Sequence, residues 1–443
     1  MKIPTFSARP LALAVVAALA VSSPAVSKSI DSAISPPAAV ADAFTATVLF
    51  GGPSLSDVRP SSVSRLPVIR PSDVGGLAAP ASGHVLAIVH ASSLPLDDSQ
   101  AVTLARLFKQ GTPVLVRMDS RMPADMARVA THFGTAPNRG DMIVRNEEGV
   151  LNVFASASET AADTPALLDA FAASVGAPRS TSHETTLGAS LPGSDMPDSA
   201  AGLPTRTLDF TLVDSNGEVS GVTTVEVVHS RTAASDVKLA RIISKATIAP
   251  AGAGVRVNTK PHLEATSLLP NEYTLRHDVS VSKGELIYLD HFPVTNNATE
   301  FTQKRQSTLT TSFKDYSLQA GLERPGAVAW KAVIAPQFNG LLRTYAYPLG
   351  NFDSREKKMT PMMKVAAFEA ASYWQMPGAY EGSLSVTVSA GYALEREYWF
   401  YRYLNGKPTG ERPKHEVNAV TGLVRNTFEI PMNDPHLTAE ALR

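Results

Sequence analysis

The sequence predicts an α+β protein of several domains, in which a small α/β domain precedes a larger all-β sandwich. Three observations predict this organisation. Residues 83–176 alternate short apolar runs with helical spacings, residues 177–206 consist mainly of small and polar residues, and residues 207–443 often place apolar side chains at alternate positions. These patterns are typical of an α/β unit, a linker and a set of β-strands. A chain of 443 residues accommodates two or three domains of about 150 residues each.

The first residues have the pattern of an export signal. Lys2 and Arg9 form a positive start before an apolar run at 11–21, and small residues follow up to Ala25. A positive start, a short apolar stretch and a small-residue cut site are typical of a Sec-type signal peptide. The alternative is a membrane anchor, which would need roughly 20 apolar residues. We expect residues 1–25 to direct secretion to the extracellular space, followed by a loosely ordered extension rich in Ser, Pro and Ala over 26–82.

The α/β domain is predicted from the order of its elements. Apolar runs at 85–89 and 113–118 predict strands, and Asn146-Glu147-Glu148-Gly149 predicts a hairpin turn between two further strands. Helices are predicted where apolar residues recur at helical spacing, over 98–109, 123–133 and 164–175. The resulting order β-α-β-α-β-β-α is that of a small open α/β domain.

The segment 177–206 predicts a flexible linker. It contains hardly any apolar anchor, so it cannot bury enough surface to order itself. Exposed linkers are preferred sites of proteolysis. Arg179 and Arg206 lie near its two ends, and we take them as candidate processing sites for a trypsin-like protease.

The β-rich part is predicted from residue alternation. Leu208, Phe210 and Leu212 alternate with polar residues, and Asn216-Gly217 is a hairpin turn signal. The clearest strand is 383–392, in which apolar residues occupy every second position. Many short strands separated by turn signals are typical of a β-sandwich.

Composition and motifs argue against an enzyme. The chain has no cysteine, which excludes thiol nucleophiles, disulfides and Cys-ligated zinc. A formal net charge of −1 favours no nucleic-acid partner. The sequence contains no nucleophile elbow, phosphate-binding loop or paired-histidine zinc helix. We therefore expect no catalytic residue, no metal and no cofactor.

An aromatic cluster is our candidate membrane-binding site. Tyr373, Trp374, Met376 and Tyr380 lie in a stretch that contains Gly and Pro between two predicted strands. Aromatic loop tips suit the membrane–water boundary, because their rings are apolar and their edges polar. The alternative is that these side chains fold back into the core. A second aromatic run at 398–403 lies on a predicted strand, where core packing is the favoured interpretation.

Several segments resemble the leukocidin/hemolysin family of β-barrel pore-forming toxins. Residues 289–297 (LDHFPVTNN), followed by Glu300-Phe301, are similar to a stretch of the vibrio cytolysin type. The leader domain resembles the pro-region of that type in its order of elements and in 148–151 (EGVL). Further similar segments follow in the same order, at 238–243 with 252–257, at 311–318, at 357–365 and at 427–430.

The resemblance implies a fold and a mode of action. The fold would be a leukocidin-like sandwich with a rim region, preceded by a pro-domain that proteolysis removes. The secreted protomer would bind a membrane through rim loops, assemble into a ring and insert a stem hairpin. Tyr373, Trp374, Met376 and Tyr380 would then be rim residues.

One interval departs from the family pattern. A long Gly/Ser-rich stem is replaced here by residues 294–313 alone. A membrane-spanning β-strand needs about 9–11 residues, with apolar side chains at alternate positions. Residues 299–307 instead hold mostly Thr, Gln and charged side chains, so we expect the stem to be shortened or missing. The apolar segment 327–335 is the alternative stem, although Pro325 and Pro336 bracket it.

Three functions remain open at this point. The first is a secreted, membrane-binding cytolysin homologue with a shortened or missing stem, whose partners would be a membrane lipid or glycan and a homo- or hetero-oligomeric ring. The second is a non-perforating relative that acts as a binding, accessory or inhibitory module. The third is a secreted hydrolase that uses Asp290 and His291 as an acid–base pair.

Overall fold

The computed structural model describes most of the chain between residues 43 and 433. The described ranges are 43–51, 59–76, 85–118, 123–176, 205–334, 357–359, 365–404, 407–408 and 414–433, with short gaps at 139, 148–149, 157–163, 215, 232–235, 252, 259–262, 306–308, 315 and 402. The predicted signal peptide, most of the predicted linker and Arg179 lie outside these residues. None of the described helices is long and apolar enough to cross a membrane.

The N-terminal α/β region contains the predicted helices and strands. Its helices are α2 (Asp98–Lys109), α3 (Pro123–Phe133) and α4 (Thr164–Gly176), with 3₁₀ turns at Ser61–Val63, Pro71–Gly76 and Ala91–Ser93. Its main strands are β1 (Ala46–Phe50), β2 (Val68–Ile69), β3 (Val85–His90), β4 (Val114–Arg117), β6 (Met142–Glu147) and β7 (Val150–Ser156). Strands β1 to β4 pair in parallel, while β6 pairs antiparallel with β4 and β7.

Alternate residues of these strands pack on opposite faces of the sheet. Leu86 and Ile88 of β3 belong to a core cluster with Leu168 and Phe171 of α4. Ala87 and Val89 belong to the main core cluster, which also contains residues of α2 and α3 such as Leu107 and Val129. Both faces of the sheet are therefore covered, which is why β3 is buried along its whole length.

The extension 26–82 contains more structure than the sequence predicted. Strand β1 lies between β2 and β3 in the sheet and is buried at four of its five positions. Val63 and Val74 of the following turns are also buried. The apolar run at 46–50 is short, but as β1 it pairs with β2 on one edge and β3 on the other, and this pairing fixes its conformation.

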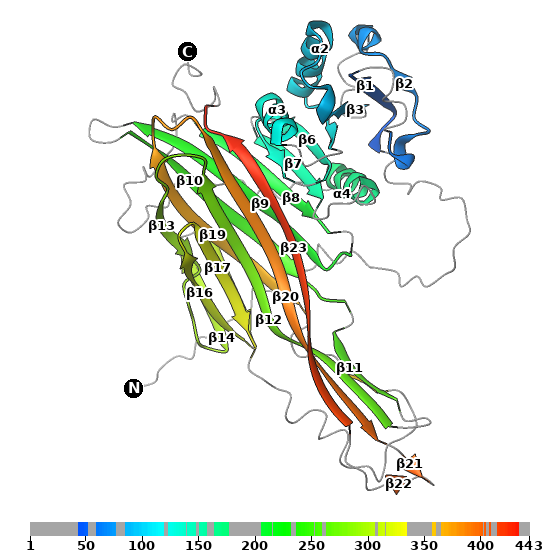
Figure 1. The fold of residues 1–443 in the computed structure, drawn as a ribbon, viewed down its shortest axis with the longest axis vertical. Coiled ribbons are helices and arrows are strands. Elements are labelled where there is room, and N and C mark those ends of the chain that lie inside the picture. Colours follow the sequence, from blue (N-terminus) through cyan, green and yellow to red (C-terminus); the bar gives the residue numbers. More distant parts are fainter. Residues whose placement is uncertain are drawn as a thin grey trace, which may run out of the picture. The chain divides into compact units, whose positions relative to one another are not determined.

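Two larger sheets form the β-sandwich (Figure 1). The first contains β8 (Thr205–Val213), β9 (Val219–Arg231), β10 (Asp236–Ile248), β19 (Ala366–Pro377) and β13 (Ile287–Phe292). The second contains β16 (Ser317–Arg324), β17 (Ala327–Val333), β12 (Leu263–Val281), β20 (Ser383–Tyr401), β23 (Lys414–Pro431) and β5 (Ala136–Pro137). In the same sheet β11 (Gly254–Asn258) pairs with β12, and β18 (Lys357–Met359) pairs with β11. A β21–β22 pair (Tyr403–Leu404, Lys407–Pro408) stands apart.

The α/β region and the sandwich share one sheet, which the sequence did not predict. Strand β7 pairs in parallel with β8, so the first sandwich sheet continues into the α/β sheet as an eleven-stranded sheet. Strand β8 begins at Thr205, inside the predicted linker. The segment 327–335, considered as an alternative stem, contains β17, which pairs with β12 and β16 within the second sheet.

Candidate functional site

The candidate site is a hairpin that belongs to neither sandwich sheet. Strands β14 (Glu300–Arg305) and β15 (Leu309–Lys314) pair antiparallel from Glu300↔Lys314 to Arg305↔Leu309. They form a separate two-stranded sheet between β13 and β16 in the chain. This hairpin occupies the interval in which the resemblance places the stem.

The inner face of the hairpin is apolar and packs on β19. The ring of Phe313 lies 5.1 Å from that of Phe301, 5.0 Å from that of Tyr316 and 5.6 Å from that of Phe368 in β19. Leu309 joins a small cluster with Phe292, Ala371 and Tyr373. The Thr311 hydroxyl donates to the Glu369 carbonyl at 2.8 Å. Side-chain packing and this hydroxyl contact therefore hold the hairpin against the sandwich.

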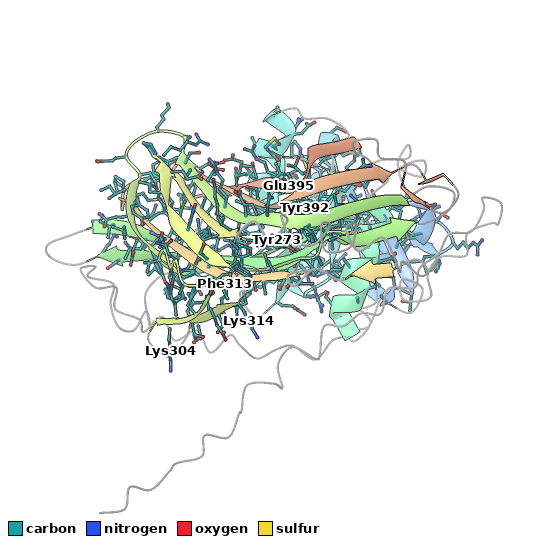
Figure 2. The ribbon with its side chains drawn as sticks, turned by 90° about the horizontal axis from the view of Figure 1, so that it is seen from below. Tyr273, Lys304, Phe313, Lys314, Tyr392 and Glu395 are labelled. Atoms are coloured by element: carbon teal, nitrogen blue, oxygen red, sulfur yellow. The ribbon has the colours of Figure 1, made fainter. Side chains whose placement is uncertain are left out.

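The outer face is polar. Residues 310, 312 and 314 are exposed, whereas 309, 311 and 313 are buried. The hydroxyls of Thr302 and Ser312 lie 2.9 Å apart across the strand pair. Figure 2 shows Phe313 on the side of the hairpin toward the sandwich strands and Lys304 and Lys314 on the opposite side. Buried and exposed positions therefore alternate along β15, and the side chains at the exposed positions are hydrophilic.

The base of the hairpin is closed by hydrogen bonds. The Gln303 side chain accepts from the Val294 main-chain N–H at 3.0 Å and donates to the Val294 carbonyl at 2.8 Å. Asn296 and Leu318 exchange main-chain hydrogen bonds of 2.7 Å. The Thr295 hydroxyl donates to the Ala320 carbonyl at 2.7 Å. These contacts attach the incoming segment of the hairpin both to β14 and to the edge strand β16.

The predicted membrane-binding residues are not on an exposed loop. Tyr373, Trp374 and Met376 lie on β19, where their exposed fractions are 6%, 1% and 1%. Trp374 and Met376 belong to the main core, and the Trp374 indole donates to the Ser372 hydroxyl at 2.9 Å. Tyr373 faces the hairpin cluster that contains Leu309. The loop placement was wrong, because the middle of β19 (370–374) is buried on both faces, with Trp374 in the main core and Tyr373 packed with Leu309 of the hairpin.

Tyr380 lies in the turn after β19 and is partly buried. Its hydroxyl donates to the Ser383 carbonyl at 2.7 Å and accepts from the Ser282 main-chain N–H at 3.0 Å. These contacts link two neighbouring turns. In the second aromatic run, the main chain of Trp399 pairs with Ala265 of β12 and His415 of β23, near the end of β20.

Arg206 is not an accessible processing site. It lies on β8, its main chain pairs with Val227 of β9, and only 9% of the residue is exposed. A protease needs an accessible chain that is not already paired in a sheet, so the prediction of a processing site at Arg206 was wrong. The second candidate, Arg179, lies outside the described residues.

Asp290 and His291 lie on the edge strand β13. The Asp290 carboxylate accepts the His291 main-chain N–H at 2.8 Å, and the His291 ring is hydrogen-bonded to the Tyr288 hydroxyl. Within the part of the chain that the structure describes, no group of three or more His, Cys, Asp or Glu residues is placed to hold a metal ion.

A buried polar network that the sequence did not reveal joins the two sheets. His277 of β12 is fully buried, with Nε2 at 2.8 Å from the Ser244 hydroxyl of β10 and Nδ1 at 3.0 Å from the Ser372 hydroxyl of β19. Its ring packs edge-on against Trp330, with centroids 4.9 Å apart. Burial lowers the pKa of His277 to about 3, so the ring is neutral at physiological pH. Ser244, His277 and Ser372 are far apart in sequence, so no local sequence motif could have predicted this network.

Comparison with known proteins finds similarity only among solved structures. No family model matches the chain, and no curated protein matches it. The chain is similar to a structure described as a pore forming protein (TM-score 0.37, 12% identity, 52% of this chain and 92% of the other), and to the Clostridium perfringens delta-toxin (0.37, 10%, 52% and 90%). It is also similar to the Clostridium perfringens NetB toxin in its membrane-inserted form (0.35, 11%, 52% and 98%). These values are too low to define the family of this chain.

Proposed function

We propose that this chain is a secreted, leukocidin/hemolysin-like protein that binds a target membrane through lipid or glycan, and that its shortened stem does not perforate the membrane unaided. The supporting observation is the β14–β15 hairpin. It lies where the sequence resemblance expects a stem, and it is docked on a two-sheet sandwich without joining either sheet.

The length of the hairpin supports the absence of a complete pore. Each of its strands has six residues. At a rise of about 3.3 Å per residue, such a strand spans roughly 20 Å, whereas the hydrocarbon core of a bilayer is about 30 Å thick. A spanning strand would have to recruit the residues that now close the base of the hairpin, including Thr295 and Asn296, and would break their hydrogen bonds.

The chemistry of the hairpin supports the same conclusion. The outward positions of β15 are Thr310, Ser312 and Lys314, and β14 adds Thr302 and Lys304. A charged side chain that faces lipid at mid-depth costs about 2–4 kcal/mol. If the inner face turned toward lipid instead, only Phe301, Leu309 and Phe313 would supply apolar contact, since Thr311 shares that face.

A vesicle experiment separates binding from perforation. The secreted, processed protein is mixed with dye-loaded vesicles of target-cell lipid, with and without glycolipid, and flotation is measured alongside dye release. We expect the protein to float with the vesicles while the dye stays inside, with detergent defining complete release. Dye release or single-channel conductance by the protein alone would overturn the proposal, and failure to float with any vesicle would remove its membrane-binding part.

The second candidate is an accessory or inhibitory module for a perforating partner. The edge position of β16 favours it: among the described strands β16 pairs only with β17, and the Thr295–Asn296 segment occupies its other edge at Leu318 and Ala320. An edge strand offers main-chain donors and acceptors to a strand of another chain. Mass measurements of vesicle-bound protein distinguish the two candidates: a ring of this chain alone supports the first, and assembly only with a perforating toxin supports the second.

A further inference from the structure

The α/β region is attached to the sandwich through a continuous strand ladder. Strand β7 pairs in parallel with β8 from Val150↔Thr207 to Ser156↔Val213. The other edge of β8 pairs with β9, so β8 is an interior strand only while β7 is present. This is the geometry by which a strand from one chain is added to the sheet of another, with main-chain hydrogen bonds providing affinity.

A second attachment lies on the opposite sheet. Strand β5 pairs with β23 at Ala136↔Glu429 and Pro137↔Phe428. The Asn138 main-chain N–H donates to the Thr427 carbonyl at 2.8 Å. From the sandwich side, the fully buried Asn426 amide donates to the Ser156 carbonyl of β7 at 2.8 Å. The α/β region therefore holds one strand of each sandwich sheet.

Apolar contacts fill the space between these attachments. Val153 and Ala155 of β7 belong to the same core cluster as Phe210 of β8 and Phe428 of β23. The rings of Phe210 and Phe428 are stacked with centroids 3.9 Å apart. Arg206 of β8 also packs closely against Gly134. Gly134 has a φ of +76°, and a Cβ atom added there would lie 2.6 Å from the Arg206 guanidinium. The junction is thus packed as an interior rather than as a loose contact between two domains.

We propose that residues 44–176 stay bound to the sandwich as a non-covalent subunit after the connecting residues 177–204 are cut. Release requires the β7–β8 ladder and the β5–β23 contact to open together. While one attachment holds, the other re-forms at the high effective concentration of a tethered partner. A cut in the connection is therefore insufficient to free the sandwich, and release needs a further event that separates β7 from β8. This proposal does not depend on the proposed membrane function.

The experiment uses the full chain with a recognition site for a specific protease inserted within 177–204. After complete cleavage, verified on a denaturing gel, the sample is passed over a size-exclusion column without denaturant. We expect both pieces to elute together at a 1:1 ratio at the volume of the uncut chain. Elution of the two pieces at separate volumes under these conditions would overturn the proposal.

Two variants test whether the second attachment contributes. Asn138→Ala and Asn426→Ala each remove side-chain contacts across the junction, and Leu423→Ala is the matched control on β23, since Leu423 is 71% exposed. We expect cut Asn426→Ala to separate at a urea concentration at which cut parent and cut Leu423→Ala still co-elute. If uncut Asn426→Ala already unfolds at a lower urea concentration than the uncut parent, Asn138→Ala is used for the same comparison. Separation of the cut control together with the variants would contradict the role of these contacts.

Discussion

The ring of Phe313 lies 5.6 Å from that of Phe368, and this contact joins the β14–β15 hairpin to strand β19 of the sandwich. Phe313 is 2% exposed although it belongs to a hairpin outside both sheets. The hairpin therefore behaves as a folded part of the core rather than as a loop on the surface.

Removing the Phe313 ring should loosen the hairpin. We expect Phe313→Ala to lower the free energy of unfolding by about 3–5 kcal/mol, as a buried Phe→Ala change does through lost transfer energy and a new cavity. Urea denaturation measures the change, and hydrogen exchange should show faster exchange in β14 and β15 than elsewhere. Thr310→Ala, on the exposed face of the same strand, is the control and should change stability little. Equal effects of the two substitutions would contradict the packing described here.

Substitution of Trp374 should destabilise the fold rather than act on membrane binding alone. Its side chain is 1% exposed and fills the core between the two sheets. We expect Trp374→Ala to lower the free energy of unfolding by about 3–5 kcal/mol. Vesicle flotation and urea denaturation are measured on the same preparation. A variant that keeps the parent's stability but no longer binds vesicles would restore the interpretation of Trp374 as a membrane contact.

The buried ring of His277 should make stability depend on pH. Its folded-state pKa, about 3, is below the value of about 6.5 in the unfolded chain, so between about pH 6.5 and pH 3 the unfolded state takes up the proton and the folded state does not. The stabilisation is complete above pH 6.5 and declines as the pH falls toward 3. The slope is about 1.4 kcal/mol per pH unit. The nearby Asp278 charge opposes the burial effect in part.

The measurement is the free energy of unfolding at pH 7 and pH 5 for the parent and for His277→Gln. We expect the parent to lose about 2 kcal/mol more than the variant between these two values. Glutamine retains hydrogen-bonding groups toward Ser244 and Ser372 but does not titrate. An identical pH dependence in both proteins would show that His277 is not the group responsible.

The buried ion pair of Arg241 and Glu226 should respond differently to single and double substitution. Arg241 Nε lies 2.6 Å from Glu226 Oε2, and both side chains are less than a tenth exposed. Removing one partner leaves an uncompensated buried charge and should cost about 3–5 kcal/mol, whereas replacing both by apolar side chains costs less. A double-mutant cycle with Arg241→Met and Glu226→Leu, read by urea denaturation, checks this. Additive losses in the double variant would contradict the expected coupling.

Local patterns predicted the elements whose packing is one-sided or strongly periodic. The spacings over 98–109, 123–133 and 164–175 predicted the three α-helices to within a residue. The Asn216-Gly217 turn was also predicted, and the structure places it between β8 and β9, with Gly217 at a φ of +67°. A prediction failed in the middle of β19, where residues 370–374 are all buried, because a segment that is covered on both faces loses the alternation that marks a strand.

The sequence by itself determined the two-part α+β organisation, the period-two strands of the sandwich and a short, mostly polar interval between β13 and β16. These properties depend on the order of residues within short segments and on segment length, both of which are visible in the sequence. Only the tertiary structure decided that β7 extends the sandwich sheet, that His277 lies between Ser244 and Ser372, and that the hairpin covers Tyr373. Each of these depends on which distant segments pair, and that choice is made by burial and hydrogen bonding across the whole core rather than by neighbours in the chain.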